Sequence, residues 1–451
     1  MVGGRRAITL ARLENAANVG RRRCEPKAVS SREMNIVVLF YRIGPYHFAR
    51  LRSAAESLRV TAVEYSNVDP FYAWDEVVGR DRFARVTLFP GAPVEQQSVG
   101  SVLARVGAVL SDVRPQVVAV PGWGDRCALA ALRWCCEEGV PAVVMSESTP
   151  WDEDRKGWKE AVKRQIVRCF AAGIGGGTSH AQYLENLGLP RERIFSGYDA
   201  VDNHYFAAGA AEIERQKAES RNQYGLPKLY FLASARFIEK KNLARLVEAY
   251  ARYRELALQA QSAIPRVKGP TFHSSSGCAN DGPWDLVLLG DGHLRQALEA
   301  QIADLNLHDH VHLPGFKQYP DLPAYYSLAR VFIHASTTEQ WGLVVNEAMA
   351  CGLPVLISRQ CGCAADLVQE GRNGFAFDPL DVAALAQLMV KVSALGFPLS
   401  QFGAASREII ARWGPEAFAS GLKQAVASAV KAGPPKVSLA QRFLLRALMQ
   451  R

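Results

Sequence analysis

Two glutamates, Glu339 and Glu347, lie eight positions apart in the segment TTEQWGLVVNEAMACGLPV. The apolar run before them predicts a buried strand, and LVVNEAMA predicts a helix that opens at Gly342. The first N–H groups of such a helix have no partner within it, and the helix dipole favours an anion beside them. The sequence therefore predicts an anion site, suited to a diphosphate, at Gly342, Leu343 and Val344.

The two carboxylates would reach different parts of a ligand bound there. Glu347 lies about one turn inside the predicted helix, where it could accept hydrogen bonds from the vicinal hydroxyls of a ribose. Glu339 precedes the helix and can reach further, towards a sugar. On spacing alone, two solvated surface carboxylates are the more frequent alternative.

Two cations follow another predicted strand, LYFLASAR. Arg236 ends that strand, and Lys241 lies at the start of the next helix. An arginine can bind a phosphate through two N–H groups at once, and a lysine adds a compact charge. The pair would suit a diphosphate leaving group, whereas isolated cations are usually only solvated. Lys240 is expected to lie outside this phosphate site.

Glycines mark turns where the main chain could approach a ligand closely. VLLGDGHLRQAL contains Gly290 and Gly292, HLPGF contains Gly315, and Gly44 lies in the loop after the first strand, MNIVVLF. A dinucleotide-binding fingerprint would require a third glycine where this chain has Arg295.

The segment with the two glutamates resembles the E-x7-E signature of the retaining glycosyltransferases of family 4, which belong to the group 1 glycosyltransferases and have the GT-B fold. The resemblance continues through DLVQEGRNGFAFDP and covers residues 35–430. It implies that Arg236 and Lys241 hold the leaving phosphate, that Glu347 holds the ribose and that Glu339 orients the sugar.

The same resemblance implies that the glycines at 290, 292 and 315 bring the main chain close to the nucleotide. It implies no metal, and no cofactor besides the nucleotide-sugar, which is a co-substrate.

The sequence departs from the family after a strand of the first half. Many members have a histidine there in a V-H-G context, whereas this chain reads AVVMSESTPWDE. Glu147 occupies roughly that region and is a candidate catalytic carboxylate, with a role outside catalysis as the alternative. His47 could face the cleft, cap a helix or belong to the core. The acidic run at 152–154 superficially matches the D-x-D metal site of the other glycosyltransferase fold.

Composition leaves several partners open. The formal charge of +9 suits a nucleotide-sugar, an acidic lipid surface or a nucleic acid. No uncharged apolar run of about 18 residues is present. The nine cysteines show no regular spacing, which favours a reducing cytoplasm. Metal sites at His310 and His312, or at Cys361 and Cys363, would need further ligands that the pattern does not supply.

Alternating strand and helix patterns predict an α/β protein with two Rossmann-like doubly wound domains that face a cleft. Residues 34–205 would form the acceptor domain, and residues 206–402 the donor domain with a flexible insertion at 262–284. A helix at 403–432 would cross back to the first domain. The Arg-rich residues 1–33 are expected to be disordered or to precede the true start at Met34.

Residues 433–451 predict a basic amphipathic tail that either packs on the surface or lies in the interface of an anionic membrane. We therefore expect a cytoplasmic enzyme, either free or peripheral at the inner membrane surface. It would transfer a hexosyl sugar from a nucleoside diphosphate sugar to a glycan, a lipid-linked glycan or a small molecule. A nucleotide-sugar epimerase of the same fold is an alternative, although no acid/base pair for it is evident. A nucleic-acid-binding protein would leave the two glutamates unexplained.

Overall fold

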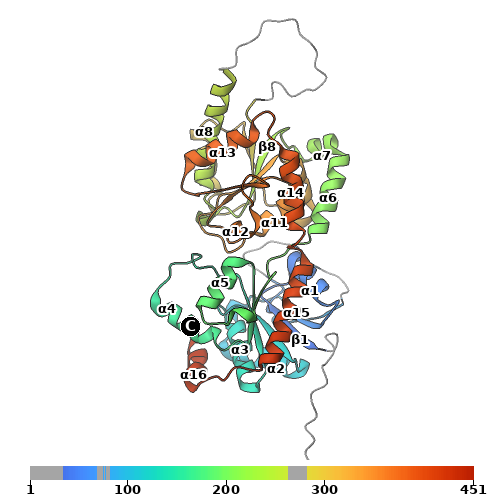
Figure 1. Cartoon of the computed structure of the whole chain (residues 1–451), viewed down its shortest axis with the longest axis vertical. Helices are drawn as coiled ribbons and strands as arrows, with labels where there is room; N and C mark the ends of the chain where they lie inside the picture. The colour runs from blue at the N-terminus through green and yellow to red at the C-terminus, as the bar shows by residue number, and fades with distance from the viewer. Residues whose placement is uncertain (1–33, 69–74, 76, 78–81, 263–281, 451) are drawn as a thin grey trace, which may run out of the picture.

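The computed structural model describes residues 34–68, 75, 77, 82–262 and 282–450 (Figure 1). Two parallel sheets, one in each half of the chain, lie one beyond the other along the long axis of the molecule. The strand order is β3-β2-β1-β4-β5-β6-β7 in the first sheet and β10-β9-β8-β11-β12-β13 in the second. The predicted α/β fold with two doubly wound domains is confirmed.

The first sheet is formed by β1 (Asn35–Phe40), β2 (Arg59–Glu64), β3 (Ala84–Thr87), β4 (Val117–Pro121), β5 (Ala142–Ser146), β6 (Ala172–Gly175) and β7 (Ile194–Ser196). Its helices are α1 (Pro45–Ala54), α2 (Val99–Val113), α3 (Arg126–Glu138), α4 (Gly157–Val167) and α5 (Thr178–Asn186). Alternate residues of β1 pack into different apolar clusters, Val37 and Leu39 into one and Ile36, Val38 and Phe40 into the other. Helices therefore cover both faces, as expected for parallel strands that are apolar throughout.

The second sheet is formed by β8 (Tyr230–Ser234), β9 (Asp285–Leu289), β10 (Val311–Gly315), β11 (Val331–His334), β12 (Val355–Ser358) and β13 (Gly374–Phe377). Its helices are α6 (Asn203–Arg215), α7 (Lys217–Tyr224), α8 (Leu243–Ser262), α9 (Arg295–Asp304), α10 (Leu322–Leu328), α11 (Leu343–Ala350), α12 (Ala364–Leu367), α13 (Val382–Ser393) and α14 (Leu399–Ile410). The predicted boundary at 205/206 falls inside α6. Because α6 packs against α10 and α11, the second domain begins with this helix.

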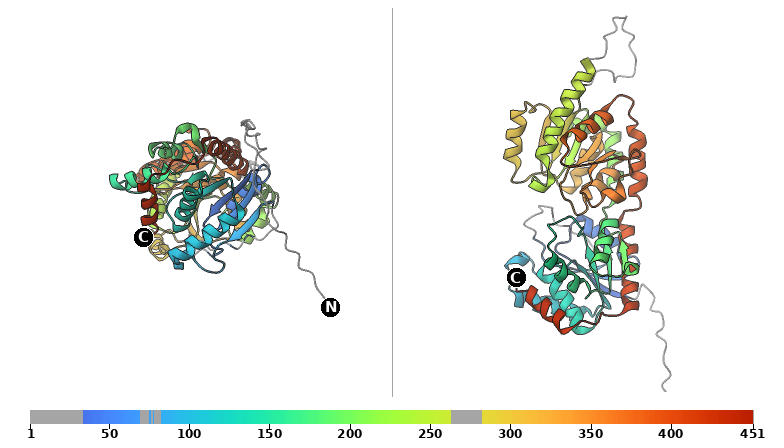
Figure 2. Two further views of the ribbon diagram at one scale, coloured as in Figure 1. Left: turned by 90° about the horizontal axis from the view of Figure 1, so that it is seen from below. Right: turned by 60° about the vertical axis from the view of Figure 1, so that its left-hand side comes forward.

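The predicted single crossover helix at 403–432 is wrong in detail, because two helices share this segment. α14 packs against α11 in the second domain, and α15 (Pro415–Ala432) packs against α1, β6 and β7 in the first. Figure 2 shows one helix beside each domain. Gly414 in extended conformation and Pro415 at the first helical position start the second helix anew. The chain thus returns to the first domain through a turn.

Two predicted segments fall largely or wholly outside the described residues. The predicted extension at 1–33 lies wholly outside them. Of the insertion predicted at 262–284, residues 263–281 lie outside them. The flanking residues belong to α8, which ends at Ser262, and to the short connection that leads into β9.

The tail forms α16 (Leu439–Leu448), which packs against α3 and α4 of the first domain. Leu445 and Met449 are buried in the apolar cluster beneath it, whereas Leu439 is 85% exposed and Phe443 is 73% exposed. The surface-packed alternative is therefore observed, and two apolar side chains still face solvent. No helix in the described part of the chain is long and apolar enough to cross a membrane.

Leu445→Ala tests whether α16 belongs to the first domain's core. Removing a buried leucine side chain leaves a cavity, and we expect a loss of about 3 kcal/mol in chemical denaturation followed by circular dichroism. Leu439→Ala on the same helix is the matched control and should change stability by less than about 0.5 kcal/mol. Equal effects of the two substitutions would mean that α16 does not contribute to the core.

Candidate active site

A cavity of about 540 Å³ lies between the two domains and is lined by residues of both. It brings together segments that follow β5, β8, β9 and β11, at the edges where a doubly wound sheet usually binds its ligand. Most of the predicted residues line it: Glu147, Arg236, Lys241, Gly290, Gly292, Glu339, Gly342, Leu343, Val344 and Glu347.

Gly44 and Gly315 are not among the residues that line this cavity. Gly44 precedes α1, and its N–H donates to Nδ1 of His47 at 3.3 Å. Burial and the nearby charge of Arg50 lower the pKa of His47 to about 3, and its ring packs on Phe40. His47 therefore has the capping and core role that the sequence left open. The carbonyl of Gly315 accepts the N–H of Gly290 at 3.1 Å, beside the cavity.

Lys241 is placed by a short turn between β8 and α8. The turn ends at Asn242, which is buried and has a φ of +58°. The Asn242 side-chain amide donates to the carbonyls of Ala335 at 3.0 Å and Pro379 at 2.7 Å. Asparagine tolerates this left-handed backbone better than most residues do. The turn is thereby fixed to the loop after β11, and Lys241 forms an ion pair with Glu339.

Glu339 lies in the loop between β11 and α11, and its environment keeps it ionised. Burial works to raise its pKa, but the hydrogen bond from His334 and the charge of Lys241 outweigh burial and hold the pKa well below its usual value. His334 Nε2 lies 3.3 Å from the carboxylate. The ionised Glu339 therefore neutralises the charge of Lys241.

Lys240 also lines the cavity, so the prediction that it lies outside is wrong. Residues Glu239–Lys241 form one turn of 3₁₀ helix. Neighbouring side chains in such a turn are about 120° apart, so Lys240 and Lys241 can both reach the cavity. Lys240 lies close enough to lower the pKa of Glu147, which is on the opposite domain.

Glu347 is one turn inside α11 and is 1% exposed. The hydroxyl of Tyr326 donates to Oε2 at 2.6 Å, and the hydroxyl of Tyr46, from the first domain, donates to Oε1 at 2.5 Å. Burial raises the pKa of Glu347 to about 7, although both tyrosine bonds lower it. The carboxylate is thus held by both domains.

A second carboxyl pair faces the cavity from the first domain. Burial raises the pKa of Glu147 and, together with the charge of Glu147, raises that of Asp199 well above its usual range. Arg50, itself 1% exposed, lies 4.0 Å from Asp199 and donates to the carbonyl of Ala200 at 2.8 Å. The raised pKa values favour the protonated form of these two carboxyls. Asp199 was not predicted, because only the fold brings it beside Glu147.

Trp341 fixes how the segment with both glutamates meets the first domain. Its side chain is 2% exposed, and its Nε1 donates to Asn346 at 2.9 Å. A Cβ at Gly176 or Gly177 would lie 3.0 Å or 2.8 Å from the indole ring. The glycine run after β6 therefore admits the tryptophan, and this GGG run is the sequence signal that could have revealed the contact.

Close packing against the neighbouring turn explains why two glycines follow β9. A Cβ at Gly290 would lie 1.9 Å from the carbonyl oxygen of Ala235, and a Cβ at Gly292 would lie 2.6 Å from that of Phe237. Both glycines have positive φ. They let the loop after β9 lie directly against the turn that contains Arg236, and so they shape the cavity wall.

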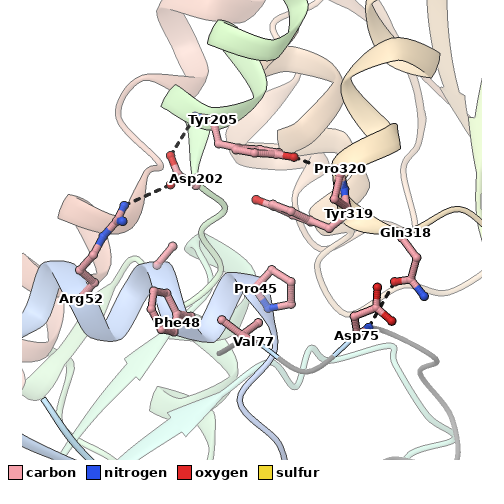
Figure 3. Close-up of a pocket in the computed structure, with 11 residues that line it drawn as sticks. Pro45, Phe48, Arg52, Asp75, Val77, Asp202, Tyr205, Gln318, Tyr319 and Pro320 are labelled. Atoms are coloured by element: carbon pink, nitrogen blue, oxygen red, sulfur yellow. Dashed lines mark hydrogen bonds and ion pairs between the residues drawn. The ribbon is translucent and has the colours of Figure 1, made fainter. Parts of the chain in front are cut away.

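The structure has further cavities outside this one. A groove of about 1200 Å³ on the first domain shares Glu147 and Gln340 with it. A smaller cavity of about 280 Å³ lies beside the first turn of α1, where Tyr205 and Tyr319 stack with ring centres 4.6 Å apart (Figure 3). There Arg52 pairs with Asp202 across the domain boundary at 3.3 Å.

The candidate metal ligands have other partners. His310 and His312 both pair with Asp285, at 3.3 Å and 2.9 Å. Within the acidic run at 152–154, the first two carboxylates pair with Arg155. Cys361 and Cys363 are buried free thiols in the second domain's core. Among the described residues, no group of three or more histidines, cysteines or carboxylates could hold a metal ion.

Residues 215–408 match the family model described as glycosyl transferases group 1. Among curated proteins, mannosylfructose-phosphate synthase of Agrobacterium fabrum is 25% identical over 240 residues, covering 52% of this chain and 48% of that protein. The 2-deoxystreptamine N-acetyl-D-glucosaminyltransferase of Niallia circulans is 32% identical over 111 residues, covering 25% of this chain and 28% of its own. The chain thus spans half or less of the length of these relatives.

Solved structures share the fold over most of the chain. Sucrose-phosphate synthase from Thermosynechococcus elongatus matches with a TM-score of 0.64 and 20% identity, covering 87% of this chain and 98% of that one. The Anabaena protein Alr3699/HepE in complex with UDP matches with a TM-score of 0.63 and 18% identity, covering 88% and 100%. The expected GT-B fold is confirmed.

Gly177→Ala tests the contact between the domains. The new Cβ would lie 2.2 Å from Oδ2 of Asp366 and against Trp341, so the second domain would have to shift. We expect a loss of about 2 kcal/mol, seen as a lower midpoint of thermal unfolding. The control is Gly157→Ala, where a Cβ meets nothing within 4 Å. If Gly177→Ala unfolds like the control, the close approach of Trp341 is not real.

Proposed function

We propose, on the premise that residues 215–408 form a group 1 glycosyltransferase domain, that this chain transfers a hexosyl-type sugar from a nucleoside diphosphate sugar to a hydroxyl group. One observation carries the proposal. A single cavity between the domains combines the cations Arg236 and Lys241 with the N-terminus of α11 and the carboxyl groups of Glu339 and Glu347.

The leaving diphosphate would be stabilised by groups that are already in place. Arg236 and Lys241 line the cavity beside the first residues of α11, where Gly342, with a φ of +102°, precedes the helix. Cations and free N–H groups fixed before reaction stabilise the negative charge that grows on the leaving phosphate. Glu347 would then accept the ribose hydroxyls, and Glu339 would orient the hydroxyls of the sugar.

We propose that the transfer retains the configuration at the anomeric carbon, as in glycosyltransferase family 4. The bond from the anomeric carbon to the phosphate oxygen breaks, and its electron pair leaves with the diphosphate. The acceptor oxygen forms its bond on the same face of the sugar, and its proton passes to the leaving phosphate. Because Arg236 and Lys241 supply the positive charge, no divalent ion is required.

The acceptor would lie in the first-domain groove, which meets the donor cavity at Glu147 and Gln340. A protonated Glu147 or Asp199 would give the acceptor or the sugar a hydrogen-bond donor there. The complex of HepE with UDP supports a nucleoside diphosphate ligand. A curated relative of Erwinia amylovora, the amylovoran biosynthesis glycosyltransferase AmsK, supports a glycan acceptor. The epimerase alternative is not favoured, because the relatives named above are synthases and transferases.

The test is a panel of nucleotide-sugars, each assayed for release of nucleoside diphosphate with and without a glycan or lipid-linked acceptor, in excess EDTA. We expect release with one donor class, stimulation by the acceptor and no effect of EDTA. No release with any donor would contradict the proposed transfer. Loss of activity in EDTA with rescue by Mn²⁺ would contradict metal independence.

Three substitutions test whether the position of a cation in the cavity matters, or only the net positive charge of the chain. Arg236→Ala and Lys241→Ala should each lower turnover about 100-fold, because each removes charge that stabilises the transition state. Arg252→Ala, an exposed cation on α8, is the control and should leave turnover unchanged. Steady-state release of nucleoside diphosphate is the measurement. Comparable losses in all three variants would mean that net charge, and not position, matters.

We also propose that α16 makes weak contact with anionic bilayers. Its exposed Leu439 and Phe443 lie beside Arg446, whose side chain is 62% exposed, and the whole chain carries excess positive charge. Apolar insertion next to basic residues gives reversible interfacial binding.

The double variant Leu439→Asp, Phe443→Asp should bind anionic vesicles at least about tenfold less in sedimentation at low salt. Leu395→Asp in the second domain, at a leucine that is 88% exposed, is the matched control and should bind like the wild type. Unchanged sedimentation of the double variant would place any membrane contact elsewhere.

A further inference from the structure

We infer that Tyr46 is a positioning residue of the donor site, in which a first-domain hydroxyl holds the Glu347 carboxyl group oriented for the ribose. The ribose site would then be complete only when the two domains are closed on each other. This inference rests on the proposed function, because it takes Glu347 as the ribose ligand.

Each carboxyl oxygen of Glu347 accepts a hydrogen bond from one tyrosine hydroxyl. Tyr326, from α10 of the same domain, donates to Oε2 at 2.6 Å, and Tyr46, from the first turn of α1, donates to Oε1 at 2.5 Å. A carboxylate oxygen can accept more than one hydrogen bond, so both oxygens keep capacity for a ribose hydroxyl. Tyr46 and Glu347 both line the donor cavity.

The ring of Tyr46 is held in place by aromatic contacts across the domain boundary. Its edge meets Tyr319 with ring centres 5.7 Å apart, and Tyr319 stacks on Tyr205. Figure 3 shows Tyr205 and Tyr319 lying over Pro45, the residue that opens α1. The start of α1 and the stacked rings of Tyr205 and Tyr319 therefore hold the Tyr46 hydroxyl at Glu347.

The groups around Glu347 make its ionisation depend on these two bonds. Burial raises the pKa of Glu347 to about 7, and the bonds from Tyr326 and Tyr46 lower it. Tyr319 and Cys351 also face it, and burial raises the pKa of each of these side chains, so both stay neutral. Arg407, from α14, donates to the carbonyl of Cys351 at 3.4 Å. Near neutral pH the carboxyl is therefore close to its midpoint.

A pH dependence follows. The ionised carboxylate accepts the ribose hydroxyls better than the protonated acid does, so nucleotide affinity should rise as pH rises through about 7. Removing the Tyr46 hydroxyl removes a bond that favours the ionised form, and the pKa of Glu347 rises further. The variant then needs a higher pH to reach the same ionisation.

The experiment is calorimetric titration of the full chain with UDP, GDP and ADP from about pH 5.5 to about pH 9. Tyr46→Phe should bind the accepted nucleotide about tenfold more weakly at neutral pH, with its inflection raised by about one pH unit. Tyr326→Phe should move the inflection in the same direction. The control is Tyr41→Phe, which removes a hydroxyl bonded to Glu95 at 2.8 Å within the first domain and should change neither quantity.

The outcomes separate this inference from the proposed function. Weaker binding of Tyr46→Phe at every pH with an unmoved inflection would show a merely structural role and overturn the inference. So would binding by Tyr46→Phe that equals the wild type, while the proposed function would stand. No binding of any nucleoside diphosphate by the wild type would overturn the proposed function and this inference with it.

Discussion

The packing of Trp341 against the glycine run after β6 is the contact on which the rest of the site depends. A side chain at Gly176 or Gly177 would occupy the space of the indole, so the two domains can approach only because these residues are glycines. Trp341 lies between Glu339 and the start of α11, and its approach brings α11 within reach of Tyr46. The positions of both glutamates relative to the first domain therefore depend on this interdomain contact.

The carboxyl groups that line the cavity differ in the direction in which their pKa values are shifted. Lys241 and His334 hold the pKa of Glu339 below its usual value, whereas burial raises the pKa of Glu347, and of Glu147 on the other domain. Glu339 is therefore ionised beside Lys241, whereas burial favours proton uptake by Glu347 and Glu147. A diphosphate that binds Lys241 would release Glu339 towards the sugar. Binding and proton uptake or release are therefore linked in this cavity.

Local patterns predicted the parts of the site that lie within one strand-to-helix unit. The opening of α11 at Gly342, the pair of Glu339 and Glu347, and the turn with Lys241 depend on residues close in sequence, and all of them line the cavity. Sequence reasoning missed Tyr46 and Asp199, because their roles arise only when distant segments meet: 301 positions separate Tyr46 from Glu347. It also joined α14 and α15 into one helix, although Gly414 and Pro415 signal the break. The doubly wound folds themselves followed from strand and helix periodicity, since parallel strands are apolar on both faces.

The central claim is that the interdomain cavity binds a nucleoside diphosphate at the N-terminus of α11. A crystal structure of the full chain with the nucleoside diphosphate that it binds tests this most directly. The account predicts the diphosphate beside Arg236, Lys241 and the first N–H groups of α11, with the ribose hydroxyls on Glu347. A nucleotide bound elsewhere, or bound in this cavity with its ribose away from Glu347, would contradict it.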